Sequence, residues 1–344
     1  MAFHPLRIVK IVRETADASS FVLEVPPELA ETFGYRAGQF LTFELHVGGE
    51  RLLRCYSLAS SPDVDPAHKV TVKRVAEGRA SNWFNDVPRE GDVLEVMPPG
   101  GVFVLRPHAT PLCLFAGGSG ITPVISLVKS ALATTGRRMK LVYANRDRDS
   151  IIFRDELERL VGEHPDRLAV VHHLDHEQGF LVPAQAKAHV AGLESADFYI
   201  CGPGPFMDVV EATLLGVGVP QERIAIERFV SIGGPEDLVE DARAAREAAE
   251  RAHPDEIVVR LDGRVHRVPY APGDTVLAAA RKGGLEPPFA CEDGYCGSCA
   301  AKRLRGEVTM RKNEVFSQRE VEAGNILTCQ ARPCSGELEV SYDE

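Results

Sequence analysis

The spacing of apolar residues divides the chain into regions that differ in their predicted secondary structure. Over the first 105 residues, short runs rich in β-branched side chains are separated by clusters of Gly, Pro and Asp, a pattern typical of β-strands. The predicted strands are residues 7–15, 19–26, 39–47, 70–75 and 92–99. Residues 1–106 are therefore predicted to form a small β-barrel.

Beyond residue 106 the pattern alternates between β and α. Residues 111–132 read as a buried strand, a glycine turn and a helix. Further apolar strands are predicted at 140–147, 168–175 and 197–204, with helices at 154–164 and 205–216. Because strands that alternate with helices at this spacing form parallel sheets, residues 107–235 are predicted to be a doubly wound α/β domain.

A third region follows an Ala-, Glu- and Arg-rich stretch with little apolar surface, which is predicted to be a linker over residues 236–255. Residues 257–270 indicate a hairpin that turns at Asp262-Gly263, and residues 274–284 indicate a helix that ends in glycine. A separate small domain is therefore expected over residues 256–344.

Composition narrows the classes of function. The hydrophobic content of 44% and charged content of 26% are those of a globular protein, and the net charge of −11 argues against a nucleic-acid partner. No apolar run is long enough to insert into a membrane, and no signal peptide precedes the first strand, so a cytoplasmic protein is expected. Thiols stay reduced in that compartment, where clustered cysteines are metal or redox ligands.

Three cysteines lie together near the C-terminus, in CEDGYCGSC, and have the spacing C-x4-C-x2-C. With the distant Cys329, the residues Cys291, Cys296 and Cys299 match the plant-type 2Fe–2S ferredoxin pattern. Zinc is the alternative, but zinc sites usually show two C-x2-C pairs or later histidines. Cys334 fits neither pattern and is interpreted as a loop thiol.

A flavin site is suggested by Arg54-Cys55-Tyr56-Ser57, in which an aromatic ring can stack on an isoalloxazine and an arginine can neutralise phosphate. Downstream, Lys73 and the turn Gly78-Arg79-Ala80-Ser81 offer donors for a pyrophosphate. The alternative is a tyrosine of the barrel core beside solvated arginines. The motif alone does not decide between the two.

A nucleotide site is suggested by two turns that follow apolar strands. Gly117-Gly118-Ser119-Gly120-Ile121-Thr122-Pro123 opens a helix, where backbone N–H groups can hold a dinucleotide phosphate. Cys201-Gly202-Pro203-Gly204-Pro205-Phe206-Met207 closes a later strand, and its small residues allow a flat ring to approach the backbone. The alternatives are a tight βα turn and a packed cysteine.

These motifs, in this order, resemble the ferredoxin–NADP reductase superfamily, in the oxygenase-reductase branch that carries a C-terminal ferredoxin domain of the α+β, β-grasp type. The carriers are RCYS, VKR with GRAS, GGSGITP, YANRDRDSIIF, CGPGPFM, ERF and CEDGYCGSC, which cover nearly the whole chain.

The resemblance implies roles by position. FAD would be held by Arg54, Cys55, Tyr56, Ser57, Val72, Lys73, Gly78, Arg79, Ala80, Ser81 and Phe229. The nicotinamide cofactor would be lined by Gly117, Gly118, Gly120, Thr122, Pro123, Arg146, Cys201, Gly202, Pro203 and Met207. Ser57, Cys201 and Glu227 would surround the hydride-transfer centre, and the cluster ligands would be Cys291, Cys296, Cys299 and Cys329.

The implied activity is electron transfer from a nicotinamide cofactor through FAD to the cluster. A nicotinamide gives two electrons as a hydride and the cluster accepts one at a time, so the flavin must act between them. The expected partner is a terminal oxygenase, of Rieske type, served by a monomeric reductase. The alternatives are a reductase for another oxygenase, a free-standing diaphorase and, in a different class, a zinc-stapled nucleotide-binding regulator.

The choice between NADH and NADPH depends on residues 145–150. Arg146 and Arg148 can grip a 2′-phosphate, whereas Asp147 and Asp149 can accept hydrogen bonds from a free 2′-hydroxyl and repel phosphate. We expect NADH, with NADPH possible. Three nearby histidines are not expected to bind a metal, because the adjacent pair must point to opposite faces of its strand; they are His172, His173 and His176.

Overall fold

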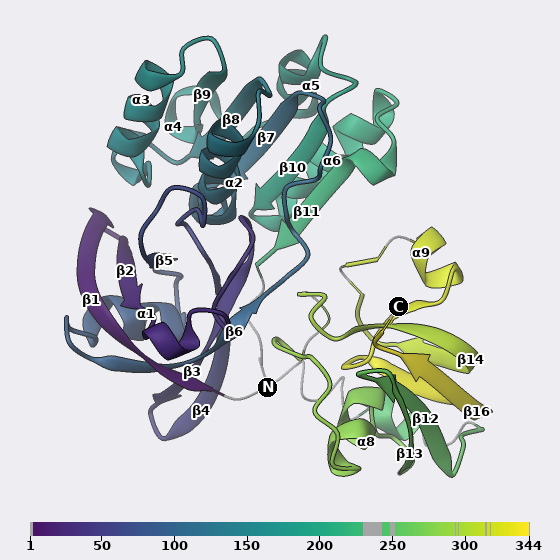
Figure 1. Cartoon of the computed structure of the whole chain (residues 1–344). Coiled ribbons are helices and arrows are strands. Elements are labelled where there is room, and N and C mark those ends of the chain that lie inside the picture. The colour runs from purple at the N-terminus through teal and green to yellow at the C-terminus, as the bar shows by residue number, and fades with distance from the viewer. Residues whose placement is uncertain are drawn as a thin grey trace. The chain divides into compact units, whose positions relative to one another are not determined.

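The computed structural model describes residues 3–229, 243–247, 252–292, 294, 296–313, 315–316 and 318–343. The chain divides into two compact units, and the division falls after Phe229. The first unit contains the barrel and the α/β domain, and the second contains the C-terminal domain (Figure 1). No helix among the described residues is both long and apolar enough to cross a membrane.

The N-terminal domain is a six-stranded antiparallel sheet with the strand order β4-β3-β6-β1-β2-β5. A bridge between Leu58 and Val70 joins the two edges, so the sheet closes as the predicted barrel. Inside it, the ring of Phe84 lies 5.2 Å from that of Phe21 and 5.4 Å from that of Phe43. The elements are β1 (His4–Thr15), β2 (Ala18–Glu24), η1 (Pro27–Leu29), β3 (Phe40–Val47), β4 (Glu50–Ser57), β5 (His68–Lys73), α1 (Arg79–Asp86) and β6 (Val93–Gly100).

Three of these elements, the short η1, strand β4 and helix α1, are absent from the sequence prediction. Strand β4 carries the proposed flavin motif, and helix α1 begins inside the segment interpreted as a glycine turn. The helix forms because Ala80, Ser81 and Phe84 lie on one face and are buried against the barrel. The N-terminus of α1 therefore replaces the predicted turn at Gly78.

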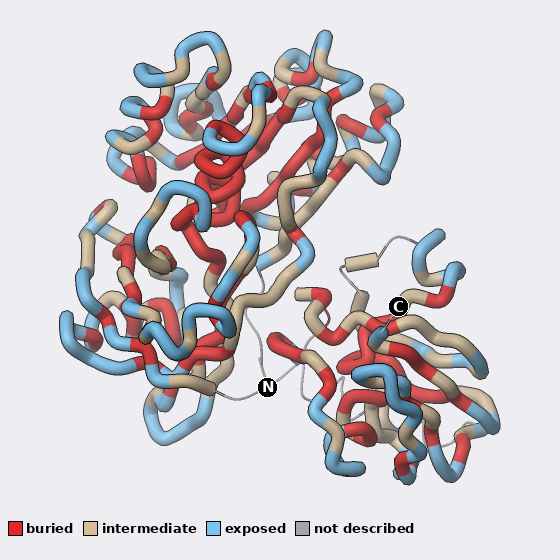
Figure 2. Tube along the Cα trace, in the orientation of Figure 1, coloured by how far each residue is buried: buried red, intermediate tan, exposed pale blue. Residues whose placement is uncertain are grey.

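The α/β domain is a parallel sheet, as predicted; it has five strands in the order β11-β10-β7-β8-β9, and β11 is absent from the prediction. Helices α2 and α3 pack on one face and α5 and α6 on the other, and burial follows the strands and α2 (Figure 2). The elements are β7 (Leu112–Gly117), η2 (Gly118–Gly120), α2 (Ile121–Thr134), β8 (Met139–Asn145), η3 (Arg148–Ser150), α3 (Arg154–Glu163), β9 (Leu168–Leu174), α4 (Asp175–Gln178), α5 (Pro183–Val190), β10 (Asp197–Gly202), α6 (Gly204–Gly216), η4 (Gln221–Arg223) and β11 (Ile224–Arg228).

The strand order reverses at β7, because β8 lies on one side of it and β10 on the other. Ligands of doubly wound sheets bind at such a switch point, beyond the carboxyl ends of the strands. The glycine loop after β7 and the loop after β10 both lie there.

The C-terminal domain is a mixed five-stranded sheet with the order β13-β12-β16-β14-β15, in which β12 and β16 are parallel. The predicted hairpin turns at Asp262 and Gly263, whose φ angles of 54° and 69° fit a type I′ turn. Residues 243–247 of the predicted linker are helical, and most of its other residues lie outside the described part of the chain. The elements are β12 (Glu256–Leu261), β13 (Arg264–Pro269), α8 (Val276–Lys282), β14 (Ala300–Met310), α9 (Gln318–Glu322), β15 (Asn325–Leu327) and β16 (Ala331–Ser341).

Candidate functional site

The glycine loop at the end of β7 is pressed against the end of β10. A Cβ atom added at Gly120 would lie 2.0 Å from the carbonyl oxygen of Cys201, far inside van der Waals contact. On the other side, the Tyr143 hydroxyl donates to the carbonyl of Gly118 over 3.1 Å. The loop is thus held between β10 and β8. Tyr143 is absent from the predicted site, although its place two residues before the end of a strand is a usable signal.

The side chains predicted to line the nicotinamide cofactor are mostly buried. Thr122 donates to the carbonyl of Ser119 over 3.0 Å and is 2% exposed. Pro123 lies inside α2, and Met207 belongs to the core on the opposite face of the sheet. The loops after β7 and β10 therefore present mainly backbone at the switch point. Their small residues there are Gly118, Gly202 and Pro203.

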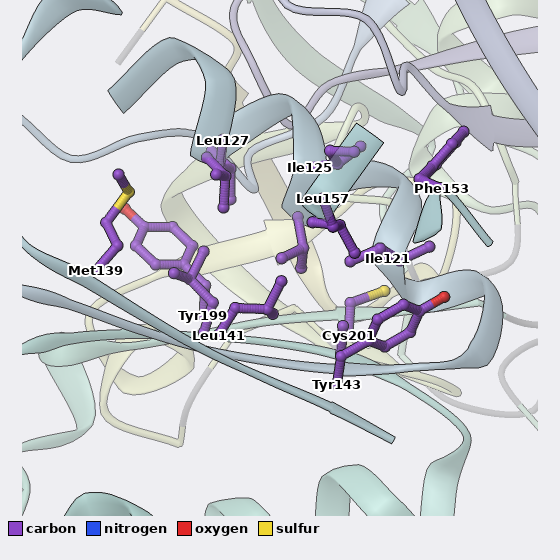
Figure 3. Close-up of a cluster of buried hydrophobic side chains, with 14 of the residues drawn as sticks. Ile121, Ile125, Leu127, Met139, Leu141, Tyr143, Phe153, Leu157, Tyr199 and Cys201 are labelled. Carbon is purple, nitrogen blue, oxygen red and sulfur yellow. The ribbon is translucent and has the colours of Figure 1, made fainter. Parts of the chain in front are cut away.

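One row of side chains runs across the sheet. Strand register places Glu227 beside Cys201, Cys201 beside Ala116 and Ala116 beside Tyr143. Figure 3 shows Cys201 and Tyr143 within the buried cluster under α2. The Cys201 thiol is fully buried, and burial raises its pKa, so it stays a neutral thiol.

A hydrogen bond links this row to the barrel. The Ser57 hydroxyl, at the end of β4, donates to Oε2 of Glu227 over 3.2 Å. Burial raises the pKa of Glu227 to about 8, although the bond from Ser57 opposes the shift. Glu227 is therefore mainly a neutral acid at pH 7, able to hold or release a proton where the two domains meet. The structure thus brings together Ser57, Cys201 and Glu227.

The flavin motif lies along β4. The Tyr56 ring lies 5.1 Å from Phe84 and nearly perpendicular to it, so one edge of this half-buried tyrosine belongs to the barrel core. Cys55 contacts the Thr42 hydroxyl over 3.4 Å, and Arg54 donates to the carbonyl of Leu53. The packing against Phe84 is that of a tyrosine of the barrel core, and the stacking of Tyr56 on a flavin stays a prediction.

The N-terminus of α1 adjoins this strand. Ser81 accepts from the amide of Val75 and donates to the carbonyl of Gly78, both over 3.2 Å, which closes the loop before the helix. Arg79 pairs with Glu50 over 2.6 Å and so ties the helix to the β3–β4 hairpin. Free N–H groups of a first helical turn favour an anion.

The other predicted flavin residues have different surroundings. Val72 is fully buried, so only its backbone can reach a cofactor. The ammonium of Lys73 lies 3.9 Å from the carboxylate of Asp17 and faces Gly118. Ala80 lies on the buried face of α1, and Phe229 is 41% exposed just after β11. The stacking predicted for Phe229 stays a prediction.

The loop after β8 contains opposite charges that neutralise one another. Arg146 bonds to Asp147 over 2.9 Å, and Arg148 lies 3.7 Å from Glu177. Asp147 also accepts from the amide of Ser150 and caps η3, and its bond from Arg146 lowers its pKa to about 2. A 2′-phosphate would have to compete with these carboxylates for the arginines.

The histidine segment has structural surroundings. His173 is 2% exposed, and its ring shares a hydrogen bond of 2.8 Å with the carbonyl of Gly179. His172 points to the other face of β9, toward Tyr143, with ring centroids 5.9 Å apart. The two rings therefore diverge, as expected for neighbours on a strand.

The proposed cluster cysteines lie in the loop before β14 and after β15. Gly294 and Gly297, with φ angles of 81° and 71°, adopt left-handed conformations that only glycine takes readily, as the predicted tight loop requires. Cys291, Cys299 and Cys329 are buried and Cys296 is half-buried.

Hydrogen bonds link Cys291 to Cys296 and Cys299 to Cys329. The amide of Cys291 donates to the sulfur of Cys296 over 3.5 Å, and a hydrogen bond between the thiols of Cys299 and Cys329 lowers the pKa of Cys299. No group of three or more potential ligands to a single metal ion is found in the part of the chain that the structure describes. Four cysteines held close together fit a cluster of two irons held by four cysteines.

Family models match each domain in turn. An "Oxidoreductase FAD-binding domain" matches residues 5–105, an "Oxidoreductase NAD-binding domain" residues 114–212 and a "2Fe-2S iron-sulfur cluster binding domain" residues 259–334. Together with the fold, these matches define an iron–sulfur flavoprotein oxidoreductase that uses NAD(P)H.

Similar proteins extend over almost the whole chain. The ferredoxin reductase component of a 3-ketosteroid-9-alpha-monooxygenase from Rhodococcus rhodochrous is 44% identical over 98% of this chain and 96% of its own length. One of the subunits of a 1,2-phenylacetyl-CoA epoxidase from Escherichia coli K12 is 33% identical over 99% of this chain and 98% of its own length. The chain belongs to the ferredoxin–NADP reductase superfamily, in the branch with FAD-binding, NAD-binding and C-terminal 2Fe–2S domains.

Among solved structures, phthalate dioxygenase reductase matches with a TM-score of 0.61 and 29% identity, covering 98% of each chain. That reductase is described as a modular structure for electron transfer from pyridine nucleotides to a 2Fe–2S centre. The predicted fold class, cofactors and reaction class are therefore confirmed, and the zinc-stapled regulator is excluded.

The close approach at Gly120 yields a stability prediction. Gly120→Ala keeps an allowed backbone conformation but drives a methyl group into the carbonyl of Cys201. We expect the free energy of unfolding to fall by about 1–3 kcal/mol, as for overpacked sites. Gly216→Ala, where no atom lies within 4 Å of the added Cβ, is the matched control. Equal denaturation midpoints in urea for the two variants would contradict the packing role.

The raised pKa of Glu227 predicts a pH-dependent stability. Between the ordinary carboxyl pKa of 4.5 and about 8, the folded protein holds a proton that the unfolded chain releases. Stability should therefore fall across this window in the wild type relative to Glu227→Gln, which stays neutral. We expect the Tm of the variant minus that of the wild type to rise from pH 5 to pH 8 and then level off. A difference that does not change with pH would show that Glu227 ionises normally.

Proposed function

We propose that this chain is the reductase component of a Rieske-type 3-ketosteroid 9α-hydroxylase, which takes electrons from NADH. The observation that carries the proposal is the end-to-end match, at 44% identity, to a protein with that printed role. The segments YANRDRDSIIF, CGPGPFM and VSYDE also resemble such reductases. A reductase that serves a phenylacetyl-CoA epoxidase is the alternative, because a subunit of such an enzyme is 33% identical.

The barrel would hold FAD, which accepts a hydride and gives up single electrons. Tyr56 offers the part of its ring that lies outside the core, and the first turn of α1 offers N–H groups to the pyrophosphate. Arg54 supplies a cation on the same strand. Ser57 and the neutral acid Glu227 share a hydrogen bond that can hold a proton beside the reacting ring.

The nucleotide domain would hold NADH across the switch point. The bare backbone of the η2 loop suits the pyrophosphate, and Gly202 and Pro203 allow a flat ring to lie close to β10. Cys201 supports this surface from below, because its buried side chain packs under α2.

The C-terminal domain would bind the cluster through the thiols of Cys291, Cys296, Cys299 and Cys329. Backbone N–H groups of the glycine loop lower the negative charge at the sulfurs by hydrogen bonding, as at Cys296. The electrons would leave this domain for a separate oxygenase.

Reconstitution tests the proposal. The purified holoprotein, NADH and the oxygenase of a 3-ketosteroid 9α-hydroxylase should form 9α-hydroxylated steroid, and Cys299→Ser should abolish product formation because the second iron loses a ligand. Flavin reduction by NADH and ferricyanide reduction should survive in that variant. The readouts are product analysis, the 2Fe–2S EPR signal and stopped-flow flavin absorbance.

Cys334→Ser is the matched control, since Cys334 is not one of the four proposed ligands, and it should retain the EPR signal and product formation. A normal EPR signal in a Cys299→Ser, Cys329→Ser double variant would refute the ligand assignment. Product formation only with a phenylacetyl-CoA epoxidase would favour the alternative partner.

The charge pairs after β8 predict nicotinamide preference. Because Asp147 and Glu177 already neutralise Arg146 and Arg148, we expect kcat/KM for NADH to exceed that for NADPH by about tenfold or more, the value of one favourable charged contact. Asp147→Asn should narrow the gap by freeing Arg146. Steady-state assays with both cofactors measure this, and an NADPH preference that collapses in Arg146→Ala would reverse the assignment.

A further inference from the structure

A lysine is buried within the first unit, where the barrel meets the nucleotide domain. The side chain of Lys129, on α2, is 2% exposed. Its ammonium lies 2.6 Å from the carboxylate of Asp65, in the loop that connects β4 and β5, and 3.0 Å from that of Glu156, on α3. One cation of the nucleotide domain is thus shared between a carboxylate of each domain.

A second lysine belongs to the barrel and contacts the nucleotide domain. Lys69, on strand β5 of the barrel, lies 3.2 Å from the other oxygen of Glu156. Its ammonium also lies 4.7 Å from the ring centroid of Phe153, the residue before α3. The four residues Asp65, Lys129, Glu156 and Lys69 form a chain of alternating charges, hereafter the charged clamp.

Buried hydroxyl groups adjoin the clamp. Ser61 and Ser130 share a hydrogen bond of 2.7 Å, and Ser126 donates to the carbonyl of Ser60 over 2.6 Å. All four serines are at most 2% exposed. Each of these bonds joins the barrel to α2, so a shift of one domain against the other leaves several buried polar groups without partners.

A shift of the barrel against the nucleotide domain would cost free energy, because it would break buried ion pairs. Burial alone would raise the pKa of Glu156, but Lys69 and Lys129 lower it below its ordinary value, so the carboxylate stays charged. Buried ion pairs add little net stability compared with apolar packing, but breaking one leaves an uncompensated charge. An intact buried ion pair therefore adds little to the free energy of unfolding, whereas a broken one is costly. The clamp thus favours one alignment of the two domains over other alignments more than it stabilises the folded state.

The clamp is connected to the reaction centre through both domains. Helix α2 begins at the glycine loop and carries Lys129 two turns later. On the barrel side, Ser60 and Ser61 follow closely after Ser57, which bonds to Glu227. The clamp therefore restrains the same two segments that would hold the flavin and the nicotinamide.

We propose that the charged clamp is a positioning device that sets the alignment of the flavin-binding barrel against the nucleotide domain for hydride transfer. This inference rests on the proposed function. Asp65, Lys69, Lys129 and Glu156 act through the segments that they restrain and contact no reacting atom. Hydride transfer is sensitive to alignment, since a misplacement of about 1 Å can cost about a hundredfold in rate.

The test uses the full-length holoprotein with FAD and the cluster in place. Lys129→Met keeps the length of the side chain and removes the charge. We expect its flavin reduction at saturating NADH to slow by about ten- to hundredfold in stopped-flow measurements. The charge-transfer absorbance of the complex between NADH and FAD should weaken. The FAD content and the EPR signal should stay at the wild-type level. Lys187→Met, at an exposed position on α5, is the matched control.

Lys69→Met provides a second test from the barrel side, where the side chain is 19% exposed and the loss of its charge is better tolerated. The Lys69→Met variant should slow flavin reduction in the same way. If Lys129→Met does not fold, Lys69→Met alone tests the positioning role. Wild-type flavin-reduction rates and charge-transfer absorbance in the folded variants, even with a lowered Tm, would overturn the positioning role. Absence of flavin reduction by NADH in the wild type would instead refute the proposed function.

Discussion

The close approach of the β7–α2 loop to the end of β10 is the constraint on which the rest of the site depends. It requires a residue without a side chain at Gly120, because the carbonyl of Cys201 occupies the place of a Cβ atom. This contact sets the height of α2 above the sheet. The position of α2 in turn places the buried cluster beneath it, the bare loop at the switch point and the lysine that reaches the barrel.

Two carboxyl groups at the boundary between the barrel and the nucleotide domain differ in their protonation. Near the switch point the carboxyl group of Glu227 has a pKa raised by burial to about 8, so it is mainly protonated at pH 7. Along α2 and α3, Glu156 is kept ionised by two lysines. One carboxyl group can therefore exchange a proton near neutral pH, and the other holds the two domains in register.

The sequence predicts the parts of this protein that depend on local chemistry. Cysteine spacing identifies the cluster loop, and the Asp262-Gly263 pair identifies a hairpin, because both signals lie within a few residues. Strand β4 and helix α1 are missed, because both segments are interpreted through their flavin-binding motifs, and the face of α1 that carries Phe84 is buried only once the barrel has formed. The clamp is missed for a stronger reason. Its carboxylates come from distant segments, and a lysine in an apolar helix gives no sign of its partners.

The position of Cys329 carries a consequence for how the protein matures. The first three proposed cluster ligands lie within nine residues of one loop, but the fourth follows β15 and reaches them only when β15 pairs with β14. Iron bound by all four thiols therefore closes a chain segment of about thirty residues, a closure that costs conformational entropy in the apo chain and that metal binding repays. Iron loading would then favour the folded form of the C-terminal domain, whereas flavin loading would favour that of the first unit. When iron is scarce, the chain would accumulate as a flavoprotein that accepts hydride but has no outlet to its oxygenase.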